Sequence, residues 1–316
     1  MRILVTGAAG FAGSHFVRSL LAGAYRGWEG ARVTALDTRP VPERHARVEA
    51  VRGDVGDPFL LRDLLPGHDA VVHFADTTRA DTAELVRTNV LGTHTLLDAI
   101  RGSGVERTVV VSTADVYGPP VADDAPRTEE HPLNPVTPYA TSRAAADLVA
   151  RSAWHTHGVD LSVTRSAVCY GPRQQPDRPL PRLVTALLED VRPRPYDGAA
   201  VREWLHVDDH CRAVHLVLNR GRAGETYHVG GEPVAPAALA ERLRALTGTR
   251  AGGHDGAVPP RAVRAVLDDG RIREELGWAP TVPFERGLAD TVDWYRDHPG
   301  WWTAARRARE AATAAA

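Results

Sequence analysis

Two residues near the middle of the chain, Tyr139 and Arg143, are spaced for proton chemistry. They lie in the segment PYATSR, where a proline-bounded loop gives way to an alanine-rich run of helical character. Residues four positions apart share one face of a helix. A permanent cation one helical turn from a phenol favours the phenolate form, so this pair predicts a tyrosine that is more acidic than usual.

A second chemical signal lies at the start of the chain, in VTGAAGFAGSHF. Gly7, Gly10 and Gly13 follow an apolar run and open a predicted helix. A turn this tight needs residues without Cβ, and a pyrophosphate needs unobstructed backbone N–H groups at a helix N-terminus. Asp37 ends the next apolar run, near the distance of about 20 residues expected for an acid that binds a ribose 2'-hydroxyl. The pattern predicts a dinucleotide-binding site.

The residue at position 37 favours NAD over NADP as the cofactor. A carboxylate repels a 2'-phosphate, although Arg39, two residues later, can offset that repulsion. Asp54 follows a third apolar run and has two interpretations. It can accept a hydrogen bond from the adenine amino group, or it can cap a turn.

Short apolar runs alternate with helical patterns over about the first 170 residues. The expected strands are 2–6, 32–37, 48–55, 70–75, 108–113 and 161–168. The expected helices are 11–23, 57–65, 84–101 and 139–157. Nearly continuous apolar strands are typical of a parallel sheet covered on both faces. The sequence therefore predicts an α/β fold with a doubly wound parallel (Rossmann) sheet.

The regular alternation ends after residue 170. Two Pro-rich segments, 171–181 and 191–198, come first. Further helical patterns follow at about 209–219, 236–247 and 284–296, and RRAREAATAAA at the end predicts a helix that frays. We expect a dinucleotide-binding domain at 1–170. Residues 171–316 are expected to form mainly a smaller, partly interleaved substrate-binding lobe, with some segments returning to the first domain.

Composition narrows the class of protein. The chain is 43% hydrophobic and 25% charged, which is ordinary for a globular protein. Thirty-eight basic and 40 acidic side chains give a net charge of -2, so a nucleic-acid partner is not expected. No apolar stretch approaches the ~18 residues of a membrane span, and no secretory leader precedes the first apolar run. We therefore expect a cytoplasmic protein without a membrane partner.

The cysteine and lysine contents are also informative. Cys169 and Cys211 stand alone in separate segments, which favours reduced structural thiols, and no metal site is expected. His206 and His210 are four residues apart, but no third ligand is evident. The sequence contains no lysine, so all the permanent cations on its side chains are guanidinium groups.

Six segments together resemble the extended short-chain dehydrogenase/reductase (NAD-dependent epimerase/dehydratase) family, which remodels nucleotide sugars. In the family's order and spacing they read TGAAGFAG, VVHFA, TNVLGTHTLLDA, VSTADVYG, PYATSR and REWLHVDDH. The resemblance covers about residues 1–295 and is greatest to the dTDP-glucose 4,6-dehydratases, especially over 201–214. It implies an enzyme that transiently oxidises carbon 4 of a nucleotide-linked hexose with NAD.

The resemblance also implies roles for individual residues. In the family, a tyrosine is the base toward the sugar 4-hydroxyl and a lysine four residues later binds the nicotinamide ribose; here these positions hold Tyr139 and Arg143. Arginine keeps the charge, but its planar fork is bulkier than an ammonium group. Thr113 occupies the position that hydrogen-bonds the sugar 4-oxygen. The expected cofactor-binding residues are Gly7, Gly10, Phe11, Ala12, Gly13, Asp37, Asp54, Val55, Ala75, Tyr139 and Arg143.

One departure affects the chemistry directly. Dehydratases of this family carry an adjacent Asp-Glu pair, an acid for the departing 6-hydroxyl and a base for the 5-proton. Ala114 and Asp115 occupy these positions, so the acid is missing and the base is one methylene shorter. Three reactions remain open: 4,6-dehydration, which the resemblance favours, 4-epimerisation, and decarboxylation of a hexuronate, which needs no acid for a leaving hydroxyl. The alternative of another class is a non-catalytic NAD(H)-binding protein, which Ala114, Arg143 and Val168 favour.

The implied substrate is a nucleotide-diphosphate sugar, linked to dTDP or UDP. Arg202 matches a diphosphate-binding arginine, and Arg178 lies where dehydratases carry a basic residue; two such cations suit a diphosphate. Tyr196 is a candidate for stacking on the nucleobase, although it is one place out of register. Members of this family usually pair through two long helices, so we expect a homodimer formed by 84–101 and 139–157.

Overall fold

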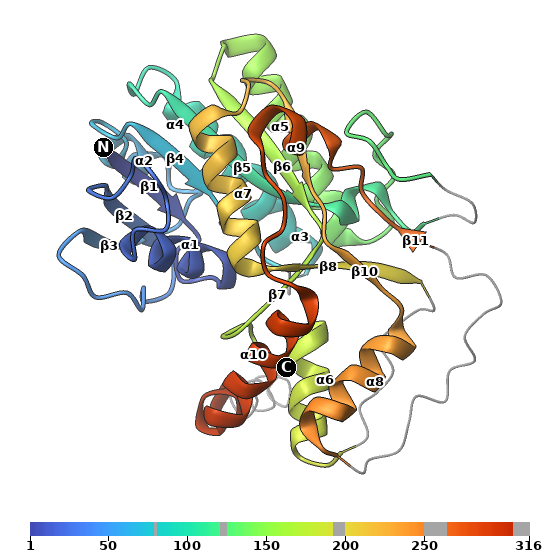
Figure 1. Ribbon diagram of the computed structural model, residues 1–316. Helices are drawn as coiled ribbons and strands as arrows, with labels where there is room; N and C mark the ends of the chain where they lie inside the picture. The colour runs from blue at the N-terminus through green and yellow to red at the C-terminus, as the bar shows by residue number, and fades with distance from the viewer. Residues whose placement is uncertain (79–80, 121–124, 192–199, 250–263, 306–316) are drawn as a thin grey trace.

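The computed structural model describes residues 1–78, 81–120, 125–191, 200–249 and 264–305. Within these residues, a large sheet of seven parallel strands has the order β3-β2-β1-β4-β5-β6-β9. The strands are β1 (Arg2–Thr6), β2 (Arg32–Asp37), β3 (Val48–Arg52), β4 (Ala70–His73), β5 (Arg107–Thr113), β6 (Leu161–Ser166) and β9 (Thr226–Val229). This sheet confirms the predicted doubly wound α/β fold (Figure 1).

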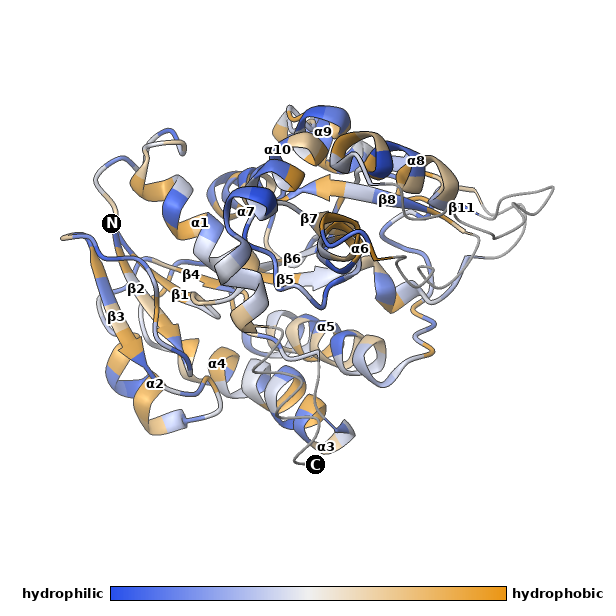
Figure 2. Cartoon of the chain, turned by 90° about the horizontal axis from the view of Figure 1, so that it is seen from below, coloured by the Kyte–Doolittle hydropathy of each residue, from blue (hydrophilic) through white to orange (hydrophobic). Residues whose placement is uncertain are grey.

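Helices cover both faces of the large sheet (Figure 2). One face carries α1 (Phe11–Leu21), α7 (Val207–Arg220) and α9 (Gly270–Leu276), and the other carries α2 (Pro58–Leu64), α4 (Gly92–Ile100) and α5 (Pro138–His157). In β1, Ile3 and Val5 are buried in the first core, and Leu4 between them is buried in the second. Because both faces are covered, the strand is apolar along its length.

A smaller mixed sheet forms the second lobe. Its strands are β7 (Val168–Tyr170), β8 (Val201–His206), β10 (Glu232–Val234) and β11 (Arg264–Ala265). β7 and β11 pair with β8 in parallel, and β10 pairs with it antiparallel. This lobe also contains α6 (Pro179–Leu188), α8 (Pro236–Thr247) and α10 (Phe284–Asp297). These helices lie together away from the large sheet (Figure 1) and bury a third core around Trp204 and Leu239.

Local sequence determines where α5 begins and ends. The Thr137 hydroxyl oxygen accepts a hydrogen bond from the Ala140 N–H at 3.1 Å, and Pro138 occupies the first helical position. Gly158 ends the helix in the left-handed conformation, with φ at +66°. Tyr139 therefore lies in the first turn, and Arg143 lies one turn further along the helix.

The predicted helix at 84–101 is interrupted. The structure has α3 (Thr82–Leu85), then a π-helical turn, η1 (Val86–Leu91), and then α4. A hydrophobic period near 3.6 residues does not reveal a single wide turn, so the sequence did not indicate it. The buried Asn89 lies within this turn.

Other expectations differ at their edges or fall outside the described residues. β3 ends at Arg52, earlier than the predicted 48–55, because the chain turns where Asp54 Oδ1 accepts from the Gly56 N–H at 2.8 Å. Tyr196 and the predicted helix at the end of the chain lie outside the described residues. Among the residues described, no helix combines the length and the apolar character needed to span a membrane.

Candidate active site

Two adjoining clefts open where the strands of the large sheet end. The Asp37 cleft, of about 460 Å³, is lined among others by Gly7, Gly10, Phe11, Asp37, Asp54, Val55 and Ala75. The Tyr139 cleft, of about 280 Å³, is lined among others by Ala12, Gly13, Thr113, Asp115, Tyr139, Arg143 and Arg202. Arg178 and the glycine turn line both. All the predicted site residues that the structure describes therefore lie in one region of the fold.

The glycine turn is packed too closely to accept side chains. Gly7 has φ at +69°, and a Cβ there would lie 2.6 Å from the backbone nitrogen of Ala75. A Cβ on Gly13 would lie 2.3 Å from the carbonyl oxygen of Gly7. These approaches pack the turn after β1 against the segment after β4 and the start of α1 against that turn, so the turn lines both clefts with backbone that has no Cβ.

Asp37 is held in place by the backbone around it. Its Oδ2 accepts from the Ala9 N–H at 2.9 Å, and its Oδ1 accepts from the Arg39 N–H at 2.9 Å and from Arg39 Nε at 3.4 Å. The residue is 8% exposed. Each carboxylate oxygen has two lone pairs, so Asp37 retains capacity to accept ribose hydroxyl groups. The cation of Arg39 is engaged by the same carboxylate.

Arg143 is buried beneath the Tyr139 cleft. The residue is 2% exposed, and one terminal nitrogen, Nη2, donates to the carbonyl oxygen of Val111. The other, Nη1, is buried and has no hydrogen-bond partner among the described residues. A buried guanidinium nitrogen without an acceptor is costly, so this group is suited to a ligand that supplies one.

The hydroxyl of Tyr139 has an acidic neighbour that the sequence did not single out. Tyr139 Oη donates to Asp76 Oδ2 at 3.1 Å. Burial, and next to it the Asp76 carboxylate, raise the pKa of Tyr139 well above its usual value, whereas Arg143 lowers it by less. The expectation that Arg143 makes this tyrosine more acidic than usual was therefore right in direction for that one interaction and wrong for the sum.

Thr113 and Asp115 come from the end of β5 and the short 3-10 helix after it, η2 (Ala114–Tyr117). The Thr113 hydroxyl oxygen accepts from the Asp115 N–H at 3.2 Å. Asp115 is open to the cleft, but the surrounding protein raises the pKa of its carboxyl, and Arg202 and Arg178 oppose that rise. Ala114 packs instead against a small apolar cluster that contains Tyr117 and Leu267.

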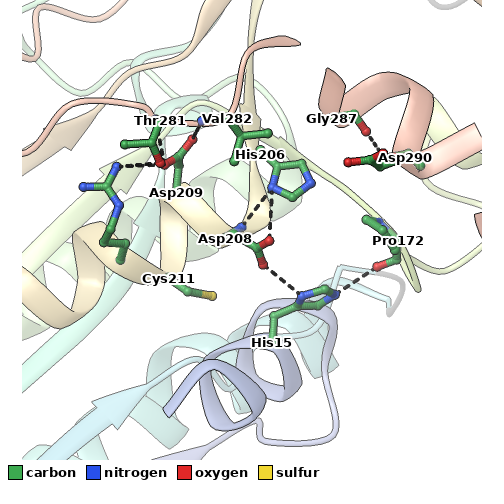
Figure 3. Close-up of polar contacts among 12 residues, drawn as sticks. His15, Pro172, His206, Asp208, Asp209, Cys211, Thr281, Val282, Gly287 and Asp290 are labelled. Carbon is green, nitrogen blue, oxygen red and sulfur yellow. Dashed lines mark hydrogen bonds and ion pairs between the residues drawn. The ribbon is translucent and has the colours of Figure 1, made fainter. Parts of the chain in front are cut away.

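Side chains of the segment 201–214 contact α1 and the segment before α10 (Figure 3). Asp208 lies between His15 of α1 and His206, 3.5 and 3.6 Å from their Nδ1 atoms, and His15 Nε2 lies 2.9 Å from the Pro172 carbonyl oxygen. The next residue, Asp209, accepts from the backbone N–H of Thr281 and of Val282, both at 2.9 Å. The motif thus fixes the start of α7 against α1 and against the segment before α10.

Sequence reasoning did not assign Asp76 to the Tyr139 cleft, and it considered His210 only as a metal ligand. Asp76 directly follows HFA at the end of β4, and carboxyl ends of parallel strands meet at one edge of a sheet, so its position was a usable signal. His210 also lines the cleft. Burial lowers the pKa of its imidazole to about 4, so His210 is neutral near pH 7. The described residues include no group of three or more His, Cys, Asp or Glu arranged to hold a metal ion.

A family model described as the NAD dependent epimerase/dehydratase family matches residues 3–230. The chain belongs to this family. Within it, a dTDP-glucose 4,6-dehydratase of Streptomyces niveus is 44% identical over 328 residues, covering 96% of this chain and 95% of that protein. The crystal structure of DesIV, a dTDP-glucose 4,6-dehydratase of Streptomyces venezuelae with NAD bound, matches 96% of this chain and 100% of that chain, with a TM-score of 0.89 and 43% identity.

A solved structure of lower sequence identity has the same fold. A UDP-glucose 4-epimerase of Thermotoga maritima, solved with UDP-glucose, matches 94% of this chain and 99% of that chain at 26% identity, with a TM-score of 0.83. The predicted family is therefore confirmed, and so is its relation to the dTDP-glucose 4,6-dehydratases.

Proposed function

We propose that this protein is an NAD-dependent dTDP-glucose 4,6-dehydratase. The observation that carries the proposal is identity of 43–44% along nearly the whole chain to proteins of that name. The Tyr139 cleft supplies matching chemistry, because Thr113, Asp115 and Tyr139 surround one cavity beside the glycine turn. The substrate is a dTDP-linked glucose, and Arg178 and Arg202 are the cations offered to its diphosphate.

NAD fits the residues of the two clefts. The glycine turn presents backbone where any Cβ would collide, and Asp37 offers acceptors suited to ribose hydroxyls. Asp54 lines the same cleft with one oxygen engaged by the Gly56 N–H, so its second oxygen is available to the adenine amino group. The unpartnered Nη1 of Arg143 is offered to the nicotinamide ribose. When bound there, NAD would supply the acceptor for the hydride of carbon 4 of the sugar.

Cofactor choice is the first expected result. NAD should bind at least about tenfold more tightly than NADP, because Asp37 repels a 2'-phosphate and engages Arg39. Asp37→Ala should narrow that difference, since it removes the carboxylate and releases the Arg39 guanidinium. Calorimetric titration of both cofactors into both proteins measures it. NADP binding to the wild type as tightly as NAD would show that Arg39 outweighs Asp37.

The oxidation step uses groups that lie together in the Tyr139 cleft. Thr113 hydrogen-bonds the sugar 4-oxygen, and Tyr139 removes the 4-hydroxyl proton as carbon 4 loses its hydride. The resulting ketone acidifies the hydrogen on carbon 5. Asp115 is the base for that hydrogen, and its raised pKa strengthens it for this role.

Because residue 114 is alanine, two related reactions remain alternatives to 4,6-dehydration. Because position 114 offers no acid to a departing 6-hydroxyl, 4-epimerisation and hexuronate decarboxylation are the alternatives. The protein should be incubated with dTDP- and UDP-linked hexoses and hexuronates, and the products read by mass. Loss of water from dTDP-glucose supports the proposal, and loss of carbon dioxide from a hexuronate overturns it. An unchanged mass with a new NMR spectrum identifies an epimerase.

A non-catalytic NAD(H)-binding protein is the alternative of another class. Arg143 in place of lysine, Ala114 and Val168 are the residues in its favour. The observation that separates the two is the cofactor itself. Appearance of NADH absorbance when a nucleotide sugar is added removes the alternative, and its absence with every sugar of the panel supports it.

We further propose that the protein is a homodimer paired through η1 and α5. Val86 and Leu91 of η1 and Leu148 of α5 are 43%, 52% and 56% exposed, although the two elements pack on each other. Large apolar side chains exposed on adjoining elements are typical of an interface. Light scattering at micromolar concentration should give twice the chain mass of 34.2 kDa. A monomer at that concentration would count against pairing.

Substitution tests the position of the interface. Leu91→Asp combined with Leu148→Asp should give a monomer that retains the fold, because both side chains point away from the cores. A matched control is Phe59→Asp, which places the same charge at a residue 72% exposed on α2. If the double variant remains a dimer, the interface lies elsewhere.

A further inference from the structure

The end of β4 places a carboxylate in contact with the proposed base. Tyr139 Oη donates to Asp76 Oδ2 at 3.1 Å, although the two residues are 63 positions apart. Asp76 lines both clefts, and its side chain is exposed to the solvent within them. The contact joins the loop after β4 to the first turn of α5.

A buried asparagine holds these two segments together. Asn89 Oδ1 accepts from the Thr77 N–H at 2.8 Å, and its Nδ2 donates to the Thr77 carbonyl oxygen at 2.9 Å and to the Ser142 hydroxyl oxygen at 2.8 Å. Ser142 in turn donates to the carbonyl oxygen of Tyr139 at 2.8 Å. Asn89 is 0% exposed. Because both neighbours are fixed in this way, Asp76 is held beside the phenol by the fold.

Burial and the charges around Tyr139 keep its hydroxyl protonated. Burial and Asp76 raise the pKa of the phenol, Asp115 raises it further, and Arg143 and Arg178 lower it. The raising effects prevail, so Tyr139 carries its proton near pH 7. A phenol that already holds a proton can accept another only if it passes its own to a neighbour.

We propose that Asp76 acts through Tyr139 as the acceptor of that proton. As Tyr139 Oη takes the proton of the sugar 4-hydroxyl, the original Oη–H bond breaks and an O–H bond forms on Asp76. The C4–H bond breaks at the same time, its electron pair leaves as a hydride to the nicotinamide ring, and the C4–O bond becomes a carbonyl. In the dehydration the carbonyl at carbon 4 is kept: after water has left, the hydride is returned to carbon 6, and Asp76 releases its proton to solvent. This inference rests on the proposed function. Asp76 does not contact the reacting sugar atoms in this scheme; it acts through Tyr139, whose proton it accepts.

The first test is Asp76→Asn, which keeps the shape of the side chain and removes its capacity to hold the proton. Transient NADH formation in a stopped-flow instrument should slow by about 100-fold, the usual size of a lost acid–base contribution. The slowed rate should rise about tenfold per pH unit between about pH 6 and pH 9, because the proton must leave to solvent base. The wild-type rate should be nearly flat over that range, because the proton passes to Asp76 and not to a solvent base.

Rescue and control variants make the test specific. Asp76→Glu keeps a carboxylate and should retain most of the rate. Asp76→Ala leaves space beside the phenol, so added formate should restore activity with saturation. Asp63→Asn makes the same substitution at an exposed residue of α2 that lines neither cleft and should leave both the rate and its pH profile unchanged.

Two measurements do not depend on turnover. Calorimetry should give the same NAD affinity for the wild type and Asp76→Asn, since the contact is to Tyr139. In cofactor-free protein labelled with ¹³Cζ-tyrosine, the Tyr139 resonance, assigned by its absence in Tyr139→Phe, should move in Asp76→Asn. An unmoved resonance would overturn the contact, and a lost NAD affinity with an unchanged rate would make Asp76 a cofactor ligand instead.

The outcome also separates this inference from the proposed function. If the wild type forms no NADH with dTDP-glucose, the proposed function fails. If the wild type is active and Asp76→Asn matches it in rate and pH profile, the inference alone fails. If the variant forms NADH normally but no longer releases water, Asp76 acts in elimination, and the proton transfer from Tyr139 is overturned.

Discussion

Replacing Tyr139 with phenylalanine is expected to abolish oxidation at carbon 4 while leaving NAD affinity nearly unchanged. The variant removes only the oxygen that transfers the proton, and the ring still fills its place in the first turn of α5. A lost proton transfer of this kind costs about 10³-fold or more in rate. The measurement is NADH absorbance after mixing the NAD-loaded protein with dTDP-glucose, together with calorimetric titration of NAD.

A second tyrosine provides the control. Tyr25 is 3% exposed and lines neither cleft. Tyr25→Phe removes the same atom from a buried site and should leave the oxidation rate unchanged. Full turnover by Tyr139→Phe would remove the proposed catalytic role of Tyr139, and the chain would then be better described as a cofactor-binding protein.

Loss of the Arg143 guanidinium is expected to have the next largest effect. Arg143→Met keeps much of the buried length but removes the cation that we propose binds the nicotinamide ribose, so the oxidation rate should fall by about 100-fold and NAD affinity by about tenfold. Both losses follow from the surroundings of the two terminal nitrogens of Arg143. One nitrogen of the fork is bound to the Val111 carbonyl oxygen, and the other is buried without a partner among the described residues.

Arg143→Lys distinguishes an adapted pocket from a tolerated replacement. An ammonium group is a compact charge and lacks the fork of arginine, so a lysine that reaches Val111 cannot present a second nitrogen in the same geometry. We expect about a tenfold loss in rate and in NAD affinity, measured as for the methionine variant. A lysine variant equal to or faster than the wild type would show that the pocket does not depend on the guanidinium.

Several parts of the site could be predicted because their physical cause is local. Gly7, Gly10 and Gly13 mark a turn with no room for Cβ, and that requirement can be recognised from residues close together in the sequence. Thr137 and Pro138 fix the start of α5 in the same way. The parallel sheet followed from apolar runs whose alternate side chains enter two different cores.

Other features depended on contacts that local patterns do not encode. The π-helical turn at 86–91 adds one residue to a helical period, and no hydrophobic spacing reveals it. The net effect on the pKa of Tyr139 depended on how deeply the fold buries the phenol. Arg143 four residues away could be read from the sequence, but burial and a distant carboxylate outweigh it.

The sequence by itself determined the family, the doubly wound fold and the residues of the glycine turn, because these depend on neighbours within one turn or one strand. Only the tertiary structure decided that Asp76 meets Tyr139, that Asn89 holds their segments together and that one nitrogen of Arg143 is buried without a partner among the described residues. The contacts of Asp76 with Tyr139, of Asn89 with Ser142 and of Arg143 with Val111 join residues 63, 53 and 32 positions apart. Such contacts form only when strands distant in sequence become neighbours in the sheet and end at the same edge.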